Sequence, residues 1–315
     1  MKIGINRKTK CSRDKSCMKR PMDAFVESLK KDGAKVFNID DPLNYPECDF
    51  IVGTGIPKVS VAKRFGRHGE LDFMQKLFKT QSERGGSILV MDSGYLKRLS
   101  HIEDMNKAYY SLGFNGLNGR AKFTYKDMPS DRWDKLNIEL KPWRLEGRHI
   151  LYCSQYQFDA SVQHVSYVKL EKDTLIKLNS YTDKKVIFRP HPKKQRINAV
   201  DGIVLSRNLD SPIEKDFKDC HLVCVFNSNS AVEAVINGIP VLSIDEGCLV
   251  KPRGLTSENV CSPKVFDREC WKNNLAYSQW TIEEMLRGEA LYHINEVLSS
   301  GVRLEYKNNI PFNLS

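Results

Sequence analysis

The sequence predicts an α/β protein with two Rossmann-like domains, each built on a parallel sheet, followed by C-terminal helices. Short apolar and β-branched runs alternate with helix-like segments in both halves of the chain. A stretch rich in glycine, asparagine and aromatic residues separates the two alternating regions. The chain has 315 residues, which is long for one compact domain and sufficient for two hydrophobic cores.

In the first half, short apolar runs predict strands over 2–6, 35–39, 49–53 and 87–91. A helix is predicted over 21–31, because Pro21 suits its first turn and Gly33 lies just beyond its end. A second helix is predicted over 70–83, where apolar residues recur at helical spacing. From Asp92 to Trp143 the periodicity is poor, and no element is assigned there.

Alternation resumes in the second half. The predicted strands cover 149–153, 185–188, 203–206, 221–226 and 240–244, and the predicted helices cover 163–179, 212–217 and 231–237. The tail from about residue 266 indicates two or three helices, of which 281–300 is the clearest. We therefore expect domains over 1–146 and 147–280, with helices over 281–315 packing across them.

The composition is that of an ordinary soluble globular protein, with 41% hydrophobic and 28% charged residues. The N-terminal stretch has no apolar core of a signal peptide, and no window approaches the ~18 apolar residues needed to cross a bilayer. A cytoplasmic protein is expected. The nine cysteines are irregularly spaced, which favours free thiols and argues against a zinc site, so no metal ligand is predicted.

The net charge of +10 favours polyanionic partners. One basic run directly follows the first strand, where α/β proteins place ligand loops, and Asp14 is its one acid. The run contains Arg7, Lys8, Lys10, Arg13, Lys15, Lys19 and Arg20. It is either a solvated loop or a ligand-binding loop.

The strongest functional signal is the stretch HLVCVFNSNSAVEAVINGIPVLSID, 221–245. A buried strand runs into Ser228, Asn229 and Ser230, and a short helix follows. Hydroxyl and amide groups at a helix start, together with backbone N–H groups, form an anion site. Ser230 and Glu233 also match the S-x-x-E capping box, but a cap does not explain Ser228 or Asn229.

A second signal is RPHP, where a predicted strand ends in Arg189 and His191 lies between two prolines. The prolines restrict the backbone around His191, which could donate to a phosphate oxygen. Arg189 and Lys193 would add positive charge. The alternative is an exposed histidine at a proline-capped strand end. Because carboxyl ends of parallel strands share one edge, we expect this turn and the serine turn to face the same crevice.

RPHP followed by SNSAVEAVINGIPV resembles the C-terminal half of GT-B glycosyltransferases of the capsular-polysaccharide and bacterial sialyltransferase type. The close match covers roughly 184–247. The resemblance implies a nucleotide-sugar donor (UDP- or CMP-linked) as co-substrate and no other cofactor. It assigns phosphate binding to His191, Ser228, Asn229 and Ser230, and nucleoside binding to Glu233. It makes the second domain the donor domain and the first the acceptor domain.

The segments MDSGYLKR, 91–98, and YYSLGFNGLNGR, 109–120, look similar to phage-encoded glycosyltransferase-like proteins. This similarity implies transfer to hydroxymethylcytosine in double-stranded DNA, in host cytoplasm. The basic run would hold the DNA backbone. A set of interleaved aromatic and cationic residues would also contact the DNA. These residues are Tyr109, Tyr110, Phe114, Arg120, Phe123, Tyr125, Arg132 and Trp133.

Three other functions remain open. The acceptor could instead be a capsular or other surface glycan. A non-catalytic nucleic-acid-binding protein and a sugar-nucleotide epimerase are the remaining alternatives.

For the catalytic base, Asp92 at the end of a strand is the first candidate and Asp14 the second. Asp92 could instead cap a turn, and Asp14 could balance charge. Glu70 could begin a helix, and Asp159 could line a crevice or a turn. No DxD motif lies at a convincing strand end, which favours metal-independent transfer, with His191 and Arg189 stabilising the leaving phosphate.

Overall fold

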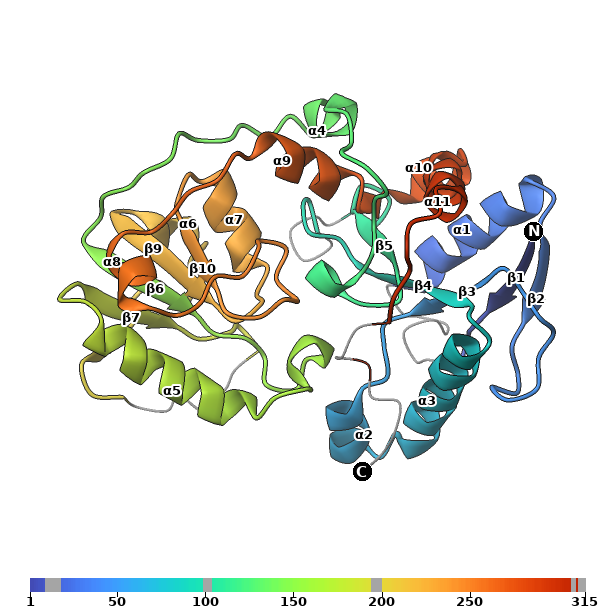
Figure 1. Cartoon of the computed structure of the whole chain (residues 1–315), viewed down its shortest axis with the longest axis horizontal. Helices are drawn as coiled ribbons and strands as arrows, with labels where there is room; N and C mark the ends of the chain where they lie inside the picture. The colour runs from blue at the N-terminus through green and yellow to red at the C-terminus, as the bar shows by residue number, and fades with distance from the viewer. Residues whose placement is uncertain (9–17, 99–103, 194–199, 307–309, 311–315) are drawn as a thin grey trace. The chain divides into compact units, whose positions relative to one another are not determined.

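A computed structural model describes residues 1–8, 18–98, 104–193, 200–306 and 310 (Figure 1). The chain divides into two compact units. Unit 1 comprises Met1–Lys135 together with Glu269–Ser315, and unit 2 comprises Leu136–Arg268. Each unit is a sheet covered by helices, which is the Rossmann-like α/β organisation that the alternating pattern predicts.

Unit 1 has a six-stranded sheet in the order β11-β5-β4-β3-β1-β2. The strands are β1 Lys2–Ile5, β2 Lys35–Asn38, β3 Phe50–Thr54, β4 Ser87–Ser93, β5 Tyr110–Phe114 and β11 Gln279–Trp280. β1 to β4 pair in parallel, whereas β5 pairs antiparallel with both β4 and β11. The sheet is therefore mixed, and the prediction of a wholly parallel sheet is wrong at this edge.

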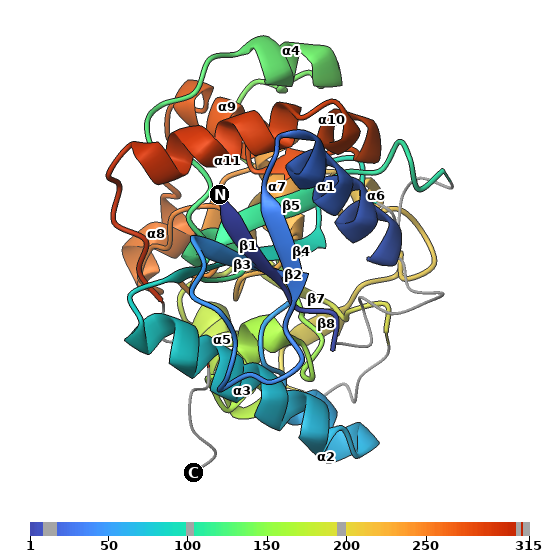
Figure 2. The ribbon, with the colours of Figure 1, turned by 90° about the vertical axis from the view of Figure 1, so that its right-hand side faces the viewer.

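Helices cover both faces of this sheet (Figure 2). On one face α1 Lys19–Lys31, α10 Ile282–Leu286 and α11 Glu289–Ser299 share a core with the strands, which includes Phe25, Phe50, Met91 and Ile294. On the other face lies α3 His68–Glu83, preceded by α2 Val59–Phe65. The central strands are buried on both faces, so they are continuous apolar runs in the sequence.

Unit 2 has a five-stranded, wholly parallel sheet in the order β10-β9-β6-β7-β8. Its strands are β6 His149–Cys153, β7 Lys185–Arg189, β8 Ile203–Leu205, β9 Cys220–Val225 and β10 Val241–Ser243. Its longest helices are α5 Tyr167–Ser180 and α7 Ser230–Ile236, with α6 Glu214–Phe217 and α8 Ser257–Cys261. Most predicted elements of this half are present.

Several elements within unit 1, and one at its boundary in the sequence, were not predicted. The poorly periodic stretch contains β5, the 3-10 helix Asn118–Arg120 and α4 Asp131–Leu136. The short strand β11 of the tail was also missed, whereas α9 Glu269–Ala276 is one of the two or three helices predicted from about residue 266. The helix predicted over 281–300 is two helices, because Gly288 has a left-handed φ of 84° between α10 and α11.

The domain boundaries also differ from the expected ones. Residues 136–146 belong to unit 2, because the backbone N–H groups of Lys141 and Arg144 donate to carbonyls of Ile236 and Gly238. Residues 269–280 belong to unit 1, because β11 extends its sheet. The buried residues of α10 and α11 are part of the unit 1 core.

The cysteines within the described ranges form no disulfide with one another. No helix in the described part of the chain combines the length and apolarity that a membrane crossing requires.

Candidate functional site

The carboxyl ends of four strands of unit 2 are level. Cys153 of β6 lies opposite Arg189 of β7 and Val225 of β9, and Val225 lies opposite Ser243 of β10. The RPHP turn follows β7 and the serine turn follows β9, so both lie at the same edge of the sheet. One strand separates them, which corresponds to roughly 10 Å between the two strand ends.

A local hydrogen bond fixes the tautomer of the neutral His191 ring. The backbone N–H of Lys193 donates to Nδ1 of His191 at 3.1 Å, so in the neutral ring the proton is on Nε2. The imidazole lies beside the Tyr156 ring, with 6.0 Å between ring centroids. The ammonium of Lys193 lies 6.0 Å from the centroid of the same ring. Tyr156 therefore lies beside both His191 and Lys193.

Arg189 has a different role from the predicted one. Its guanidinium is 2.5 Å from the Asp216 carboxylate and donates to the carbonyl oxygens of Asn208 and Ser211. Both charged side chains are largely buried. Ser206 and the Asn208 amide donate to the same Asp216 carboxylate. The structure does not support a phosphate contact by Arg189, because its donors are bonded to the loop that follows β8 and to Asp216 of α6.

The serine turn begins α7 without the predicted capping box. The N-cap residue is Asn229, and its side chain caps no helix N–H. Ser230 is the first helical residue and not the N-cap. Ser230 and Glu233 therefore each lie one position too far along the helix to form a capping box. Ser228 Oγ accepts from the Ser230 backbone N–H at 3.3 Å and lies 3.2 Å from Ser230 Oγ. The interpretation that the cap accounts for Ser230 and Glu233 is therefore wrong.

Cys153 lies between the two turns, at the end of β6. Burial raises the pKa of its thiol, and a hydrogen bond with Ser230 opposes this shift. Glu233 is close enough to act electrostatically on the same thiol. Ser230 and Glu233 thus both lie near the middle of the carboxyl edge.

A buried hydrogen-bond network joins the residues that follow three of the strands. The Asn227 amide donates to Asp245 at 2.6 Å and to the Ser161 carbonyl at 3.0 Å. The Gln155 amide donates to Asn227 and to the Ser161 hydroxyl. His164 Nε2 lies 3.0 Å from Asp245. The network holds the chain in place directly before the serine turn.

This network was missed in the sequence. The available signal was a polar residue two positions after the end of each buried strand: Gln155 after β6, Asn227 after β9 and Asp245 after β10. Asp159 accepts from the N–H and hydroxyl of Ser161, so of its two expected roles the structure favours the turn.

A second buried carboxylate supports the same edge from α5. Glu171 accepts hydrogen bonds from Ser154 at 2.5 Å and Tyr167 at 2.9 Å. The Tyr167 hydroxyl in turn accepts from the Gln155 backbone N–H at 2.7 Å. Burial raises the pKa of Glu171, although these hydrogen bonds oppose the shift.

Unit 1 has a small pocket at the carboxyl ends of β3 and β4, with a volume of about 120 Å³. Asp92 and Glu70 both line it, together with Arg67 and Lys58. Asp92 also accepts from the adjacent Ser93 N–H at 2.7 Å, the local contact expected of a turn. The pocket makes Glu70 as good a candidate base as Asp92. Asp14 lies outside the described residues.

The basic run is only partly described, since Lys10, Arg13 and Lys15 lie outside the described ranges. Arg7 and Lys19 pair with Asp23, and Lys8 pairs with Asp40. Partial burial acts to raise the pKa of Asp23, but the contacts with Lys19 and Arg7 outweigh it and lower the pKa. Arg20 is exposed. Most of the described cations therefore have an acidic partner within the chain.

The predicted DNA-contacting aromatic and cationic residues are mostly structural. Tyr110, Phe114 and Trp133 are buried in the core of unit 1. Arg120 and Arg132 are also buried. The interleaving of aromatic and basic residues reflects the packing of β5 and α4, and the interpretation as a DNA surface is wrong for these five residues.

Among the described residues, no group of three or more histidine, cysteine, aspartate and glutamate side chains is arranged to hold a metal ion.

No protein-family model matches the sequence, and no curated protein matches it. Among solved structures, Thermosulfurimonas dismutans KpsC, beta Kdo 2,4 transferase, is 10% identical with a TM-score of 0.51, over 91% of this chain and 98% of that chain. The beta Kdo 2,7 transferase of KpsC from the same organism is 12% identical with a TM-score of 0.46, over 93% and 99%.

At this identity the first similarity indicates a shared fold and not a shared activity, and the second, with a TM-score below 0.5, carries no argument. The predicted fold class, two Rossmann-like domains of the GT-B type with additional helices, is confirmed.

Proposed function

We propose that this chain is a nucleotide-sugar-dependent glycosyltransferase that elongates a surface glycan. The observation that carries the proposal is the level carboxyl edge of unit 2, where the RPHP turn and the serine turn flank β6. Nε2 of His191 and the Ser228 and Ser230 hydroxyls would donate to the donor phosphates, and Lys193 would add positive charge. Asn229 and Glu233 would contact the same donor, with Glu233 on the ribose.

In this proposal the protein contributes by holding and stabilising the leaving phosphate. Hydrogen bonds to His191 and the serine turn strengthen as negative charge develops on the phosphate. A carboxylate of unit 1, Asp92 or Glu70, would accept the proton of the acceptor hydroxyl. Because Lys193 supplies positive charge and His191 a hydrogen bond, we expect transfer without an added divalent metal.

For the acceptor we favour a glycan over hydroxymethylated DNA. The described cations Arg7, Lys8 and Lys19 are paired with carboxylates, which weakens the case for a DNA-binding loop. The solved structure with TM-score 0.51 is a Kdo transferase, which agrees with the surface-glycan alternative drawn from the RPHP resemblance.

The test is a transfer assay with a panel of CMP- and UDP-sugars. Two acceptors are compared, bacterial surface oligosaccharides and hydroxymethylcytosine DNA, and products are identified by mass spectrometry. The proposal expects a sugar mass increment on an oligosaccharide, unchanged by chelator. His191→Ala and Lys193→Ala should reduce the rate, whereas Lys177→Ala, which removes an exposed lysine of α5, should not.

Transfer to DNA alone would overturn the proposed acceptor. Turnover of the donor without any acceptor product, in the manner of an epimerase, would overturn the proposed reaction.

A further inference from the structure

Unit 1 contains a second and larger cavity, of about 420 Å³, on the side of the sheet covered by α10 and α11. We call it the aromatic pocket, because five of its lining residues have aromatic rings: Tyr125, Tyr277, Trp280, Tyr292 and His293. Of the residues singled out in the sequence, Tyr125 and Arg132 line it. Tyr292 is 69% exposed and forms its rim, whereas Trp280 and His293 are 2% exposed and form its inner wall.

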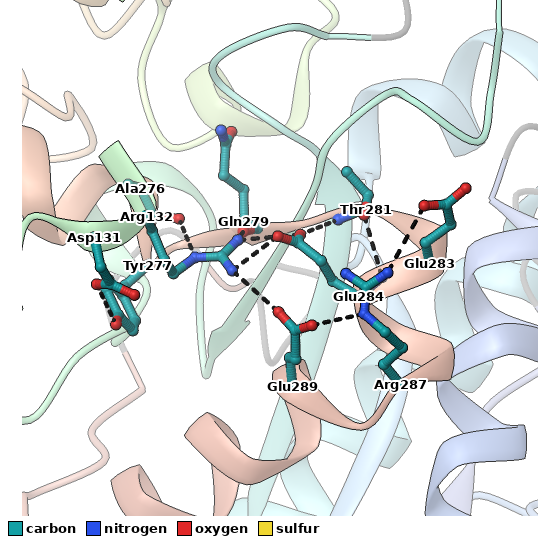
Figure 3. A network of polar contacts seen from close by, with 10 residues as sticks. All are labelled: Asp131, Arg132, Ala276, Tyr277, Gln279, Thr281, Glu283, Glu284, Arg287 and Glu289. Atoms are coloured by element: carbon teal, nitrogen blue, oxygen red, sulfur yellow. Dashed lines mark hydrogen bonds and ion pairs between the residues drawn. The ribbon is translucent and has the colours of Figure 1, made fainter. Parts of the chain in front are cut away.

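The inner wall is held by Arg132. Its guanidinium is stacked on the Trp280 ring, 3.7 Å from the centroid, and makes two hydrogen bonds with Glu284, at 2.9 and 3.1 Å. It also donates to the carbonyls of Ala276 and Gln279 (Figure 3). Arg132 is therefore fully engaged by the protein. Its role is to fix the rings that line the pocket.

Two buried polar atoms of this wall have no hydrogen-bond partner among the described residues: Trp280 Nε1 and His293 Nδ1. His293 Nε2 donates to the Phe123 carbonyl at 2.8 Å, so the neutral ring presents Nδ1 as an acceptor. Burial lowers the pKa of His293, which keeps the ring neutral. The ring centroids of Trp280 and His293 are 5.6 Å apart.

Each of these atoms has less than 1 Å² of exposed surface, so they belong to the interior of the wall. A ligand would therefore contact the exposed rings of the rim and not these two atoms. The exposed ring of Tyr292 adds a flat apolar surface of the kind that the C–H face of a sugar covers.

The charges around the pocket argue against a polyanion. Lys126, Lys135 and Arg287 line it, but so do Asp131, Glu289 and Glu296. Arg287 is also paired with Glu289 at 2.7 Å. This balance favours an uncharged, polyhydroxylated ligand over nucleic acid, which requires a net positive surface.

The sheet register relates the pocket to the candidate base. Trp280 pairs with Tyr110, and Tyr110 pairs with Ser93, the neighbour of Asp92. The backbone of Trp280 is thus two strand spacings, roughly 10 Å, from the carboxyl end of β4.

We propose that the aromatic pocket is a carbohydrate-binding site that holds a neutral sugar residue of the acceptor glycan. The assignment of the bound sugar to an acceptor glycan rests on the proposed glycosyltransferase function, but sugar binding itself does not require a donor. The test is therefore made without nucleotide sugar.

The protein is applied to a printed array of bacterial surface glycans, and the oligosaccharides that bind are titrated calorimetrically. We expect Tyr292→Ala to raise the Kd about tenfold and the matched Tyr292→Phe, which keeps the ring, to leave it near wild type. Lys177→Ala, which removes an exposed lysine of unit 2, should bind as the wild type does.

Absence of glycan binding by the wild-type protein would overturn the inference, as would binding that Tyr292→Ala leaves unchanged. Binding of a DNA duplex that Tyr292→Ala abolishes would overturn it in favour of a nucleic-acid site. Glycan binding without any sugar transfer would contradict the proposed function only, whereas transfer with an acceptor KM that Tyr292→Ala does not change would contradict this inference only.

Discussion

The carboxyl edges of the two sheets are built on different principles. In unit 2 the parallel strands end level, and buried hydrogen bonds among Gln155, Asn227 and Asp245 join the residues that follow them. In unit 1 the parallel strands are continued by antiparallel β5 and β11, and a buried ion pair, Arg132 with Glu284, fixes aromatic rings nearby. The first edge carries the RPHP and serine turns, on which the proposed donor site rests. The second offers aromatic surface with balanced charge.

The largest expected effect concerns the ion pair of unit 1. Arg132→Met leaves the Glu284 carboxylate buried without its cation, and we expect the free energy of unfolding to fall by about 3–5 kcal/mol. Urea denaturation followed by circular dichroism measures this change. Arg287→Met is the matched control, because its pair with Glu289 is exposed and should contribute at most about 1 kcal/mol. Equal losses of unfolding free energy in the two variants would mean that the buried ion pair contributes no more than the exposed one.

The corresponding test in unit 2 is Asn227→Ala. The substitution removes the amide that joins Gln155, Ser161 and Asp245, and we expect a loss of about 2–3 kcal/mol. Hydrogen-exchange mass spectrometry should show the loss of protection in peptides from β9 and β10 and not in those from β3 and β4. The control is Asn179→Ala, which removes an exposed amide of α5. Faster exchange throughout both units would mean that the network does not act locally.

A smaller effect is expected at the break between α10 and α11. Gly288 has a φ of 84°, so Gly288→Ala should cost about 1–2 kcal/mol of unfolding free energy although there is room for the new methyl group. Gly69→Ala, within α3 and with open space around its Cβ position, should instead be neutral or stabilising by up to about 1 kcal/mol. Thermal denaturation compares the two variants. Destabilisation of the same size in both would show that the left-handed backbone at Gly288 is not the cause.

The smallest effect is the pH dependence contributed by Glu171. Burial raises its pKa in the folded state, so the folded protein holds this proton more tightly than the unfolded chain does. The stabilisation from the bound proton is fully present below the ordinary value of 4.5 and is lost as the pH rises through the folded-state pKa. Glu171→Gln should therefore gain stability relative to wild type as the pH rises from 4.5 to neutrality.

The control for this prediction is Asp173→Asn, on the exposed side of the same helix. A stability difference between Glu171→Gln and wild type that is constant with pH would contradict the raised pKa of Glu171.

The sequence predicted much of unit 2 and less of unit 1, for a physical reason. A strand buried on both faces, such as β9, is a continuous apolar run, and short-range patterning is enough to recognise it. β5 and β11 are short and depend on partners distant in the chain, as in the pairing of Trp280 with Tyr110. No local pattern carries that information.

The same reason explains which parts of the candidate site were predicted from the sequence. The RPHP and serine turns are local motifs, so they were found in the sequence, and the edge they share follows from parallel pairing. The Arg132–Glu284 pair joins residues far apart in the sequence, and Arg189 appeared as a ligand candidate because its partner Asp216 lies in another element. Long-range pairing decides whether a cation is available to a ligand.

The most direct test of the central claim is a calorimetric titration of the wild-type protein and His191→Ala with CMP- and UDP-sugars in the absence of acceptor. The account predicts that the wild-type protein binds a nucleotide sugar, and that losing a hydrogen bond to a charged phosphate weakens this binding roughly 10- to 100-fold in the variant. Equal affinity of the two proteins, or no binding by the wild type to any member of the panel, would contradict it.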